Sequence, residues 1–436
     1  MKQARLNFES EFSGAELVPE PDLSRIRVNY LFLDMNSYFA SVAQQEEPRL
    51  RGRPVGIVTV DKPGAACIAA SYEAKRFGIG VGTRRAEARE LCPDIEFREA
   101  QHDLYVDYHH RIIEAIERVH PIQKAHSVDE FAIQLLGSAR EFETAKVLGE
   151  SMRRSILKRV GPAMRCSIGL GSSKLLAKMA GEMKKPDGFD WLTPEVMPDK
   201  LSGFPLGALP GIGNRMEKRL ISAGISTIPQ LYALQPKHAR KLWNSVTGER
   251  FLLALQGHDI PDPETHSHSL GHGQILSSAN RNPEGARLVA RRLLIKAATR
   301  LRRGGHFATS IHVSGKCDRL GKRACSVTIR ATQDSFELLK HFSHLWERLC
   351  LEKPLSVGVM LGRLTDRASH TADLFETRET SGVSNLREKL CSMVDELNQK
   401  FGQDTVIYGE RPREITKFTG AKIAFGRIPG KEEFRD

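Results

Sequence analysis

Two acidic features at the ends of apolar runs set the tightest limits on how this chain can fold. The apolar run at 30–33 ends in Asp34, and Asp129 and Glu130 precede an alternating run at 131–135. Alternation of this kind is typical of a half-buried strand. Adjacent residues on a regular strand point to opposite faces, so Asp129 and Glu130 can share one site only where the strand is broken. We therefore expect a strand end at this pair, with Asp34 opposite.

Three carboxylates at strand ends form a set of hard oxygen ligands that suits Mg²⁺ or Mn²⁺. Beside phosphates, such an ion activates a hydroxyl and holds a leaving pyrophosphate. Two adjacent acids also occur as ordinary surface residues of a hairpin turn that has no ligand. These residues alone leave both interpretations open.

Composition limits the class of protein. The chain has 436 residues, of which 40% are hydrophobic, enough for several cores and about three or four domains. We see no signal segment and no run near the roughly 18 apolar residues of a membrane span, and therefore expect a soluble, cytoplasmic protein without membrane contact. Seven cysteines without Cys-x-x-Cys spacing favour reduced thiols over a zinc ribbon or a disulfide framework.

The net charge of +12 is concentrated in one stretch. Between His268 and Arg330, thirteen Lys or Arg stand against two acids. A solvated helix face normally mixes both signs, so this excess indicates a polyanion such as nucleic acid as the ligand. A basic surface without a dedicated ligand is the alternative. The candidate DNA contacts, on a helix predicted over 283–303, are Arg291, Arg292, Arg302 and Arg303.

Strands and helices alternate along the first 190 or so residues, which indicates a mixed α+β domain. We predict helices over 101–119, 141–160 and 174–183, and a strand over 164–170. The segment Gly169-Leu170-Gly171 lacks the Gly-Lys-Ser/Thr of a P-loop, so a Walker nucleotide site is rejected.

The segment 71–78 is predicted to be a short helix that Ser71 caps and Gly78 ends. It presents an aromatic residue and two cations within reach of a triphosphate. Cations near a helix C-terminus are also favoured by the helix macrodipole, which is the alternative explanation.

A glycine hairpin, Leu-Pro-Gly-Ile-Gly at 209–213, precedes a helix predicted over 216–223. This pattern is typical of a helix-hairpin-helix, in which backbone N–H groups bind a DNA phosphate without reading sequence. Gly211 and Gly213 are its candidate contacts, and a plain αα corner is the alternative. After a linker at 261–268, strands near 309–313 and 326–329 complete a basic α+β module, and a last helix is predicted over 385–401.

Five motifs in order give the chain a family resemblance. They are Asp34 followed by aromatics, Tyr-x-x-Lys-Arg-Phe-Gly at 72–78, Ser-Val-Asp-Glu at 127–130, Lys-Lys-Pro-Asp-Gly at 184–188 and the hairpin at 209–213. Over about residues 29–365 the chain resembles the Y-family of lesion-bypass DNA polymerases, most of all its bacterial polymerase IV branch. The resemblance implies a multi-domain α+β right-hand polymerase: a ferredoxin-like palm (27–36 and 100–192), small fingers (37–99), a helix-hairpin-helix thumb (193–262), an α+β little finger (266–366), a flexible extension (1–26) and a tail (367–436).

The resemblance implies low-fidelity, template-directed DNA synthesis across lesions by two-metal-ion nucleotidyl transfer. Two Mg²⁺ ions, or Mn²⁺, would be held by Asp34, Asp129, Glu130 and the carbonyl of Met35. Phe39 would be the steric gate, an aromatic ring under the sugar that leaves no room for a 2′-hydroxyl. An ordinary core aromatic is the alternative for Phe39.

The nucleotide phosphates would be contacted by side chains of two segments. By resemblance these are Tyr72, Lys75, Arg76 and Lys185. Lys75 stands where the family usually has Arg, which replaces a bidentate fork with a point charge. Ala43 replaces an acid that is common in the first motif of the family. We expect these two departures to affect the affinity for the incoming nucleotide and not the catalytic chemistry.

The tail segment Thr371-Ala372-Asp373-Leu374-Phe375 resembles the bacterial sliding-clamp peptide, with Thr371 in place of the typical glutamine. Leu374 and Phe375 would fill an apolar pocket of the clamp. The implied partners are primer-template DNA, dNTPs and the sliding clamp, and we expect the chain to be a monomer. A non-catalytic DNA-bound scaffold and a nucleotidyl cyclase on a similar palm are the alternatives; the cyclase explains neither the hairpin nor the basic module.

Overall fold

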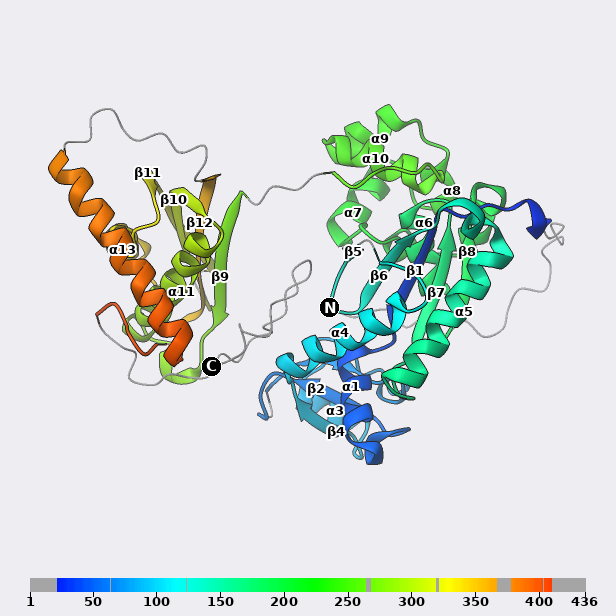
Figure 1. Cartoon of the computed structure of the whole chain (residues 1–436), viewed down its shortest axis with the longest axis horizontal. Helices are drawn as coiled ribbons and strands as arrows, with labels where there is room; N and C mark the ends of the chain where they lie inside the picture. The colour runs from blue at the N-terminus through cyan, green and yellow to red at the C-terminus, as the bar shows by residue number, and fades with distance from the viewer. Residues whose placement is uncertain are drawn as a thin grey trace. The chain divides into compact units, whose positions relative to one another are not determined.

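The computed structural model describes residues 22–62, 64–122, 124–263, 268–318, 321–366, 378–402 and 404–409. The chain divides into two compact units between Asp262 and Pro263 (Figure 1). Each unit combines helices with sheets, which confirms the predicted multi-domain α+β class. Among the described helices, none contains a stretch long and apolar enough to cross a lipid bilayer.

A five-stranded sheet in the order β5-β6-β1-β7-β8 organises the first unit. Its central strand β1 (Tyr30–Met35) pairs antiparallel with β6 (Glu130–Gln134) on one side and with β7 (Cys166–Gly171) on the other. The outer strands are β5 (Lys124–Ala125), antiparallel to β6, and β8 (Phe189–Leu192), parallel to β7. The near-continuous burial of β1 and β7 follows from helices on both faces of the sheet.

Those helices bury the two sides of β1 separately. The apolar faces of α4 (His102–Glu117) and α5 (Phe142–Arg159) pack on the side of the odd-numbered residues of β1. The helix α6 (Lys174–Met183) covers the other side, where Ala177 packs with Phe32. The three helices predicted for this part of the chain are therefore confirmed to within two residues at each end.

Glycines on β7 let α6 approach the sheet closely. A Cβ atom at Gly169 would lie 2.0 Å from the carbonyl oxygen of Ala177, and one at Gly171 would lie 2.3 Å from the nitrogen of Ala177. Both distances are far shorter than van der Waals contact. The glycines of the Gly-Leu-Gly segment on β7 therefore serve helix–sheet packing and not the binding of a phosphate by a P-loop.

A smaller three-stranded sheet, β3-β2-β4, follows α1 (Tyr38–Glu46). The hydroxyl of Ser71 accepts a hydrogen bond from the N–H of Ala74, so the predicted N-cap is confirmed. The elements of this subdomain are β2 (Val55–Val58), β3 (Cys67–Ala70), α2 (Tyr72–Arg76), α3 (Arg85–Leu91) and β4 (Glu96–Glu99).

Four helices complete the first unit and share an apolar cluster with α6. The turn before them is made by Gly211, whose φ of 96° favours glycine, and Gly213 is the N-cap of the first helix. The helix predicted over 216–223 thus begins two residues earlier. The four helices are α7 (Asn214–Ser222), α8 (Ile228–Tyr232), α9 (Pro236–Trp243) and α10 (Val246–Leu255).

The second unit contains a four-stranded antiparallel sheet in the order β11-β10-β12-β9. The helix α11 (Pro283–Arg303) coincides with its prediction, and it packs with α12 (Ser335–Leu349) on one face of the sheet. The strands are β9 (Ser269–Ile275), β10 (His306–Cys317), β11 (Gly321–Thr332) and β12 (Pro354–Asp366).

Several elements of this unit differ from the prediction. Strands β10 and β11 extend well beyond the predicted 309–313 and 326–329, because their ladder continues through polar residues. The last helix, α13 (Arg378–Phe401), begins before the predicted residue 385. The sequence did not predict β9, β12 or α12.

Candidate active site

The three predicted carboxylates lie on the ends of two adjacent strands. Asp34, near the end of β1, is the direct cross-strand partner of Glu130, the first residue of β6. Asp129 immediately precedes β6, and its carbonyl oxygen accepts a hydrogen bond from the N–H of Met35 at 3.0 Å. The expected strand break at Asp129 and Glu130, with Asp34 opposite, is therefore confirmed.

Burial opposes the ionisation of two of these acids. Asp34 is only 7% exposed. Its burial raises its pKa to about 7 against the nearby charge of Lys185, and the negative charges of Glu182 and Asp129 add to the rise. Burial also raises the pKa of Asp129, although the hydroxyl of Ser127 donates a hydrogen bond of 2.6 Å to its carboxylate. Positive charge close to these two acids therefore favours their ionised forms.

Two lysines supply part of that positive charge. The Nζ of Lys185 lies 3.0 Å from Asp34 Oδ2 and 2.6 Å from Glu182 Oε1. Burial lowers the pKa of Lys185, but the charges of Asp34 and Glu182 outweigh it and raise this pKa above its ordinary value. The Nζ of Lys178 lies 2.7 and 2.8 Å from the two carboxylate oxygens of Glu130. Each of the two lysines therefore forms an ion pair with at least one acid of the site.

The donor chemistry of the cluster fits a divalent cation, because Asp34, Asp129 and Glu130 offer hard oxygen ligands. Within the described residues, however, no three Asp, Glu, His or Cys side chains already form a metal-binding group. Both carboxylate oxygens of Glu130 are bound to Lys178. Lys178 therefore occupies one acceptor site on each of these two oxygens.

A chain of polar contacts fixes the loop that carries Lys185. The N–H of Asp187 donates to Asn36 Oδ1 at 2.8 Å, and Asn36 Nδ2 donates to Ser167 Oγ at 2.9 Å. Arg165 adds an ion pair with Asp187 at 2.9 Å. Asn36 follows Asp34 by two residues, so these contacts tie Lys185 to the end of β1.

The helix α2 places two of the predicted phosphate contacts beside the acids. Burial raises the pKa of the Tyr72 phenol to about 12, with charge effects from Lys185 and Asp34. The Nζ of Lys75 lies 4.2 Å from the centre of the Tyr72 ring, and the loss of hydration and the charge of Lys185 lower the pKa of Lys75. Charge effects thus link Tyr72 and Lys75 to Lys185, and the side chains of both Lys75 and Arg76 are exposed at the end of α2.

Phe39 lies on the first turn of α1, five residues after Asp34. Its ring stacks on Tyr105, with 4.0 Å between the ring centres and 10° between the planes. Phe39 is half-buried. Its ring therefore packs on Tyr105 and remains partly accessible to solvent.

Sequence reasoning missed Lys178, Glu182 and the side-chain role of Asn36. A signal was present, since Lys178 and Glu182 are four residues apart on a predicted helix and therefore share one of its faces. What the sequence could not supply is the face of the sheet on which that helix lies.

The predicted DNA-binding arginines of α11 do not form one surface. Arg302, whose side chain is 5% exposed, lies 2.7 Å from Asp395 of α13, and Arg292 lies 2.6 Å from Asp404. Arg302 is therefore a structural cation, and its assignment as a DNA contact was wrong, because α13 covers it from a distant part of the sequence. Arg291 is half-buried and Arg303 is exposed.

The sheet of the second unit presents a face that the prediction did not consider. On β10, Ile311 and Val313 are buried with the cluster beneath α11 and α12. The alternate residues of β10 and their partners on β11 point to the opposite face. These residues are small, polar or basic: His312, Ser314, Lys316, Lys322, Ala324 and Ser326.

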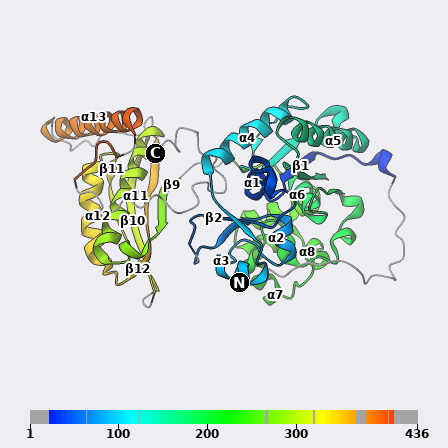
Figure 2. The same ribbon diagram turned by 90° about the horizontal axis from the view of Figure 1, so that it is seen from below.

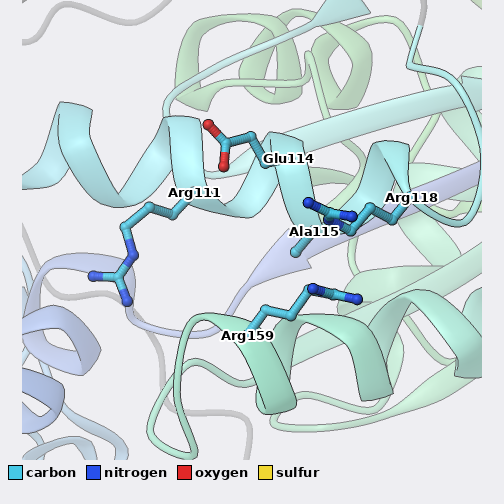
Figure 3. A pocket seen from close by; sticks show the side chains of 5 residues that line it. All are labelled: Arg111, Glu114, Ala115, Arg118 and Arg159. Atoms are coloured by element: carbon cyan, nitrogen blue, oxygen red, sulfur yellow. The ribbon is translucent and has the colours of Figure 1, made fainter.

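A separate pocket of about 220 Å³ lies between α4 and α5 (Figure 3). Arg111, Arg118 and Arg159 line it together with Glu114 and Ala115. It lies among the helices on the sheet face opposite α6 and includes none of the clustered carboxylates, so it is not a substrate pocket for them. Residues 374 and 375 of the clamp-like segment lie outside the described part of the chain.

Known proteins resemble this chain over most of its length. Residues 33–182 match the model of the impB/mucB/samB family, and residues 267–374 match the model of its C-terminal domain. DNA polymerase IV of Moorella thermoacetica is 31% identical over 410 residues, which cover 91% of this chain and 98% of the relative. DNA polymerase IV of Pelotomaculum thermopropionicum is 30% identical over 394 residues, which cover 88% and 95%.

A solved structure shares the fold. A Y-family DNA polymerase chimera of Dbh and Dpo4 superimposes with a TM-score of 0.64 and 19% identity, covering 77% of this chain and 99% of the chimera. Family models, relatives matched along almost their whole length and a shared fold lead to one conclusion. The chain belongs to the impB/mucB/samB family and is a Y-family DNA polymerase of the DNA polymerase IV branch.

Proposed function

We propose that this chain copies a DNA template, adding dNTPs to a primer 3′-hydroxyl with release of pyrophosphate, at low fidelity and across damaged bases. The observation that carries the proposal is the position of Asp34, Asp129 and Glu130 at two adjacent strand ends, with Lys185 beside them. Acids that are costly to ionise without a cation are what a metal-dependent nucleotidyl transfer requires.

The cofactor in this proposal is a pair of Mg²⁺ ions, or Mn²⁺. Asp34, Asp129 and Glu130 would hold them, together with the carbonyl of Met35. When bound, such ions lower the pKa of the primer hydroxyl and stabilise the leaving pyrophosphate. Positive charge at Asp34 would also release Lys185 from its present ion pair.

The incoming nucleotide would lie between α2 and the loop of Lys185. Once released, Lys185 would turn to the phosphates together with Tyr72, Lys75 and Arg76. The ring of Phe39 would exclude a 2′-hydroxyl, and its stack on Tyr105 would oppose displacement of the ring.

The domain boundaries are part of the same proposal. We propose that the five-stranded sheet is the palm (27–36 and 100–192), the β3-β2-β4 sheet the fingers (37–99), the helices α7–α10 the thumb (193–262) and the second unit the little finger (266–366). Primer-template DNA would contact the hairpin at Gly211 and Gly213 and the open face of the four-stranded sheet. Small side chains such as Ser314 let a sugar–phosphate backbone approach closely, and Lys316 and Lys322 supply charge.

Partners and location complete the proposal. Leu374 and Phe375 would dock on a sliding clamp, and one chain carries every group that the reaction needs. The cytoplasmic location expected from the sequence is supported by seven free cysteines. A non-catalytic scaffold is less well supported, since it has no need for three acidic residues clustered at a buried strand junction.

Primer extension tests the proposal. The purified full chain, freed of nucleic acid and supplied with Mg²⁺ or Mn²⁺, should extend a primer on undamaged templates and on a panel of damaged ones. Failure to extend any primed template, by protein that still binds primer-template DNA in a salt-dependent way, would favour the scaffold instead.

A further inference from the structure

The outer face of α13 carries a continuous apolar stripe. Scattered exposed apolar residues are normal, but a row along one helix marks an interaction surface. Figure 2 shows α13 along the outside of the second unit. The stripe consists of five side chains that are between 40% and 68% exposed: Leu386, Leu390, Met393, Leu397 and Phe401.

The stripe is not the face by which α13 packs on its own unit. Cys391 and Val394 are buried, and Asp395 binds Arg302 with distances of 2.7 and 3.0 Å. Glu388 accepts a hydrogen bond from Gln333 at 2.9 Å. These contacts fix the rotation of the helix, so the stripe points away from the core that the helix covers.

The spacing of the stripe is that of a coiled-coil seam. From Leu386 to Leu397 the apolar side chains follow one another at intervals of four, three and four residues. This is the alternation of d and a positions in a heptad repeat, which suits a second helix rather than a flat surface.

The charges beside the stripe identify the second helix. Lys389 and Glu396 are exposed and occupy the g positions of this heptad. In an antiparallel pair of α13 helices, Leu390 would pack on Met393 of the second copy, and Leu386 on Leu397 of the second copy. The same register places Lys389 opposite Glu396 of the second copy, and symmetry repeats the ion pair.

A parallel pair offers no such match. There Lys389 would face the e position of Val394, which is buried in its own unit, and Glu396 would face the e position of Phe401. Neither Val394 nor Phe401 carries a charge. The flanking charges therefore favour the antiparallel arrangement.

We propose that two copies of this chain associate through the outer faces of α13, antiparallel and with twofold symmetry. The proposal is independent of nucleotidyl transfer and departs from the monomer expected from the sequence. Four apolar layers form a short seam, so the association is concentration-dependent.

Sedimentation velocity of the full chain, freed of nucleic acid, tests the proposal over a range of concentrations. The wild type should shift from one copy to two. Leu390→Glu together with Leu397→Glu should weaken association by more than about 100-fold, because carboxylates would be buried in the seam. Val147→Glu, at a 61% exposed position on α5, is the matched control and should leave association unchanged.

A charge exchange tests the register. Lys389→Glu or Glu396→Lys alone should weaken association by about two- to tenfold, since each creates two like-charge contacts, and the double variant should restore it. A wild type that stays a single copy at all concentrations overturns the proposal. If the variant with Leu390→Glu and Leu397→Glu still forms the dimer, the stripe is not the interface. If the variant with Lys389→Glu and Glu396→Lys does not recover association, the antiparallel register is wrong.

Discussion

At the residue scale, the site combines acids whose pKa values are raised by burial with lysines that form ion pairs with them. Asp34 already shares Lys185 with Glu182, and Glu130 is bound to Lys178. Each lysine therefore occupies, in part, the position of positive charge that a metal would supply. Such pairing explains how buried acids remain close together in the folded chain without metal.

Lys75 stands at a position where the resemblance to the family leads us to expect Arg. It lies over the Tyr72 ring, where a guanidinium could stack and also offer two parallel donors to a phosphate. We predict that Lys75→Arg lowers the KM for dNTP by about two- to fivefold with little change in kcat. Steady-state single-nucleotide insertion measures this, and a raised KM would count against Lys75 as a phosphate contact.

Phe39 supplies a test of the sugar pocket. Phe39→Ala removes the ring but leaves α1 intact, so ribonucleotide insertion should rise by about tenfold or more relative to deoxyribonucleotide insertion. Competing dNTP and rNTP insertion opposite the same template base measures the ratio. Phe97→Ala, a half-buried aromatic of the three-stranded sheet, is the control, and equal effects of both variants would remove Phe39 from the gate role.

At the element scale, the approach of α6 to the five-stranded sheet positions the lysines of the site. Gly169→Ala would place a Cβ 2.0 Å from the Ala177 carbonyl oxygen. We predict that this overpacking lowers the unfolding free energy by about 1–3 kcal/mol or more. It should also weaken the contact between Lys178 and Glu130. Gly203→Ala, where a Cβ meets open space, should be nearly neutral in the same denaturant titration.

The link between α1 and β4 predicts a dependence of stability on pH. Arg98 donates to both Glu47 oxygens, at 2.6 and 2.7 Å, and these hydrogen bonds lower the pKa of Glu47 to about 2. Because the pKa of Glu47 is lower in the folded chain than in the unfolded chain, its charge stabilises the fold at pH values above about 4.5. This contribution to the unfolding free energy disappears as the pH falls from there toward 2. Because the Glu47 side chain is 35% exposed, the contribution is about 1 kcal/mol or less.

Glu47→Gln should therefore lower the unfolding free energy at pH 7 by that small amount, with the difference from wild type shrinking as the pH falls below about 4.5. Urea titrations of both proteins at several pH values measure this. A difference that grows toward acid pH would contradict the role of the Arg98 contact.

At the scale of the whole molecule, local patterns predicted local structure well. The helices α6 and α11 coincide with their predicted limits, because strong apolar periodicity and a capping Ser or Asn mark where they begin. The junction of Asp34 with Glu130 followed from the geometry of alternating strands. The features that the sequence did not predict depend on contacts between distant segments. The ion pair with Asp395 of α13 makes Arg302 a structural cation. Lys178 reaches Glu130 only because α6 lies on that face of the sheet.

The same limit explains why the sequence of the basic stretch did not show which of its arginines are accessible. A count of charges along α11 cannot tell which arginines are covered by a helix that begins some 75 residues after α11 ends. The open sheet face, with Lys316 opposite Lys322, depends on pairing between two strands that were predicted only in part. Long-range packing therefore decides which charges remain available to DNA.

The central claim is that Asp34, Asp129 and Glu130 act together as one site for nucleotidyl transfer. Single-turnover incorporation of one dNTP into primer-template DNA, with Mg²⁺ present, tests it most directly. The wild type should incorporate the nucleotide, a chelator should stop it, and Asp129→Ala should reduce the rate by about 10³-fold or more while salt-dependent DNA binding is kept. Incorporation by Asp129→Ala at a rate close to that of the wild type would contradict the account.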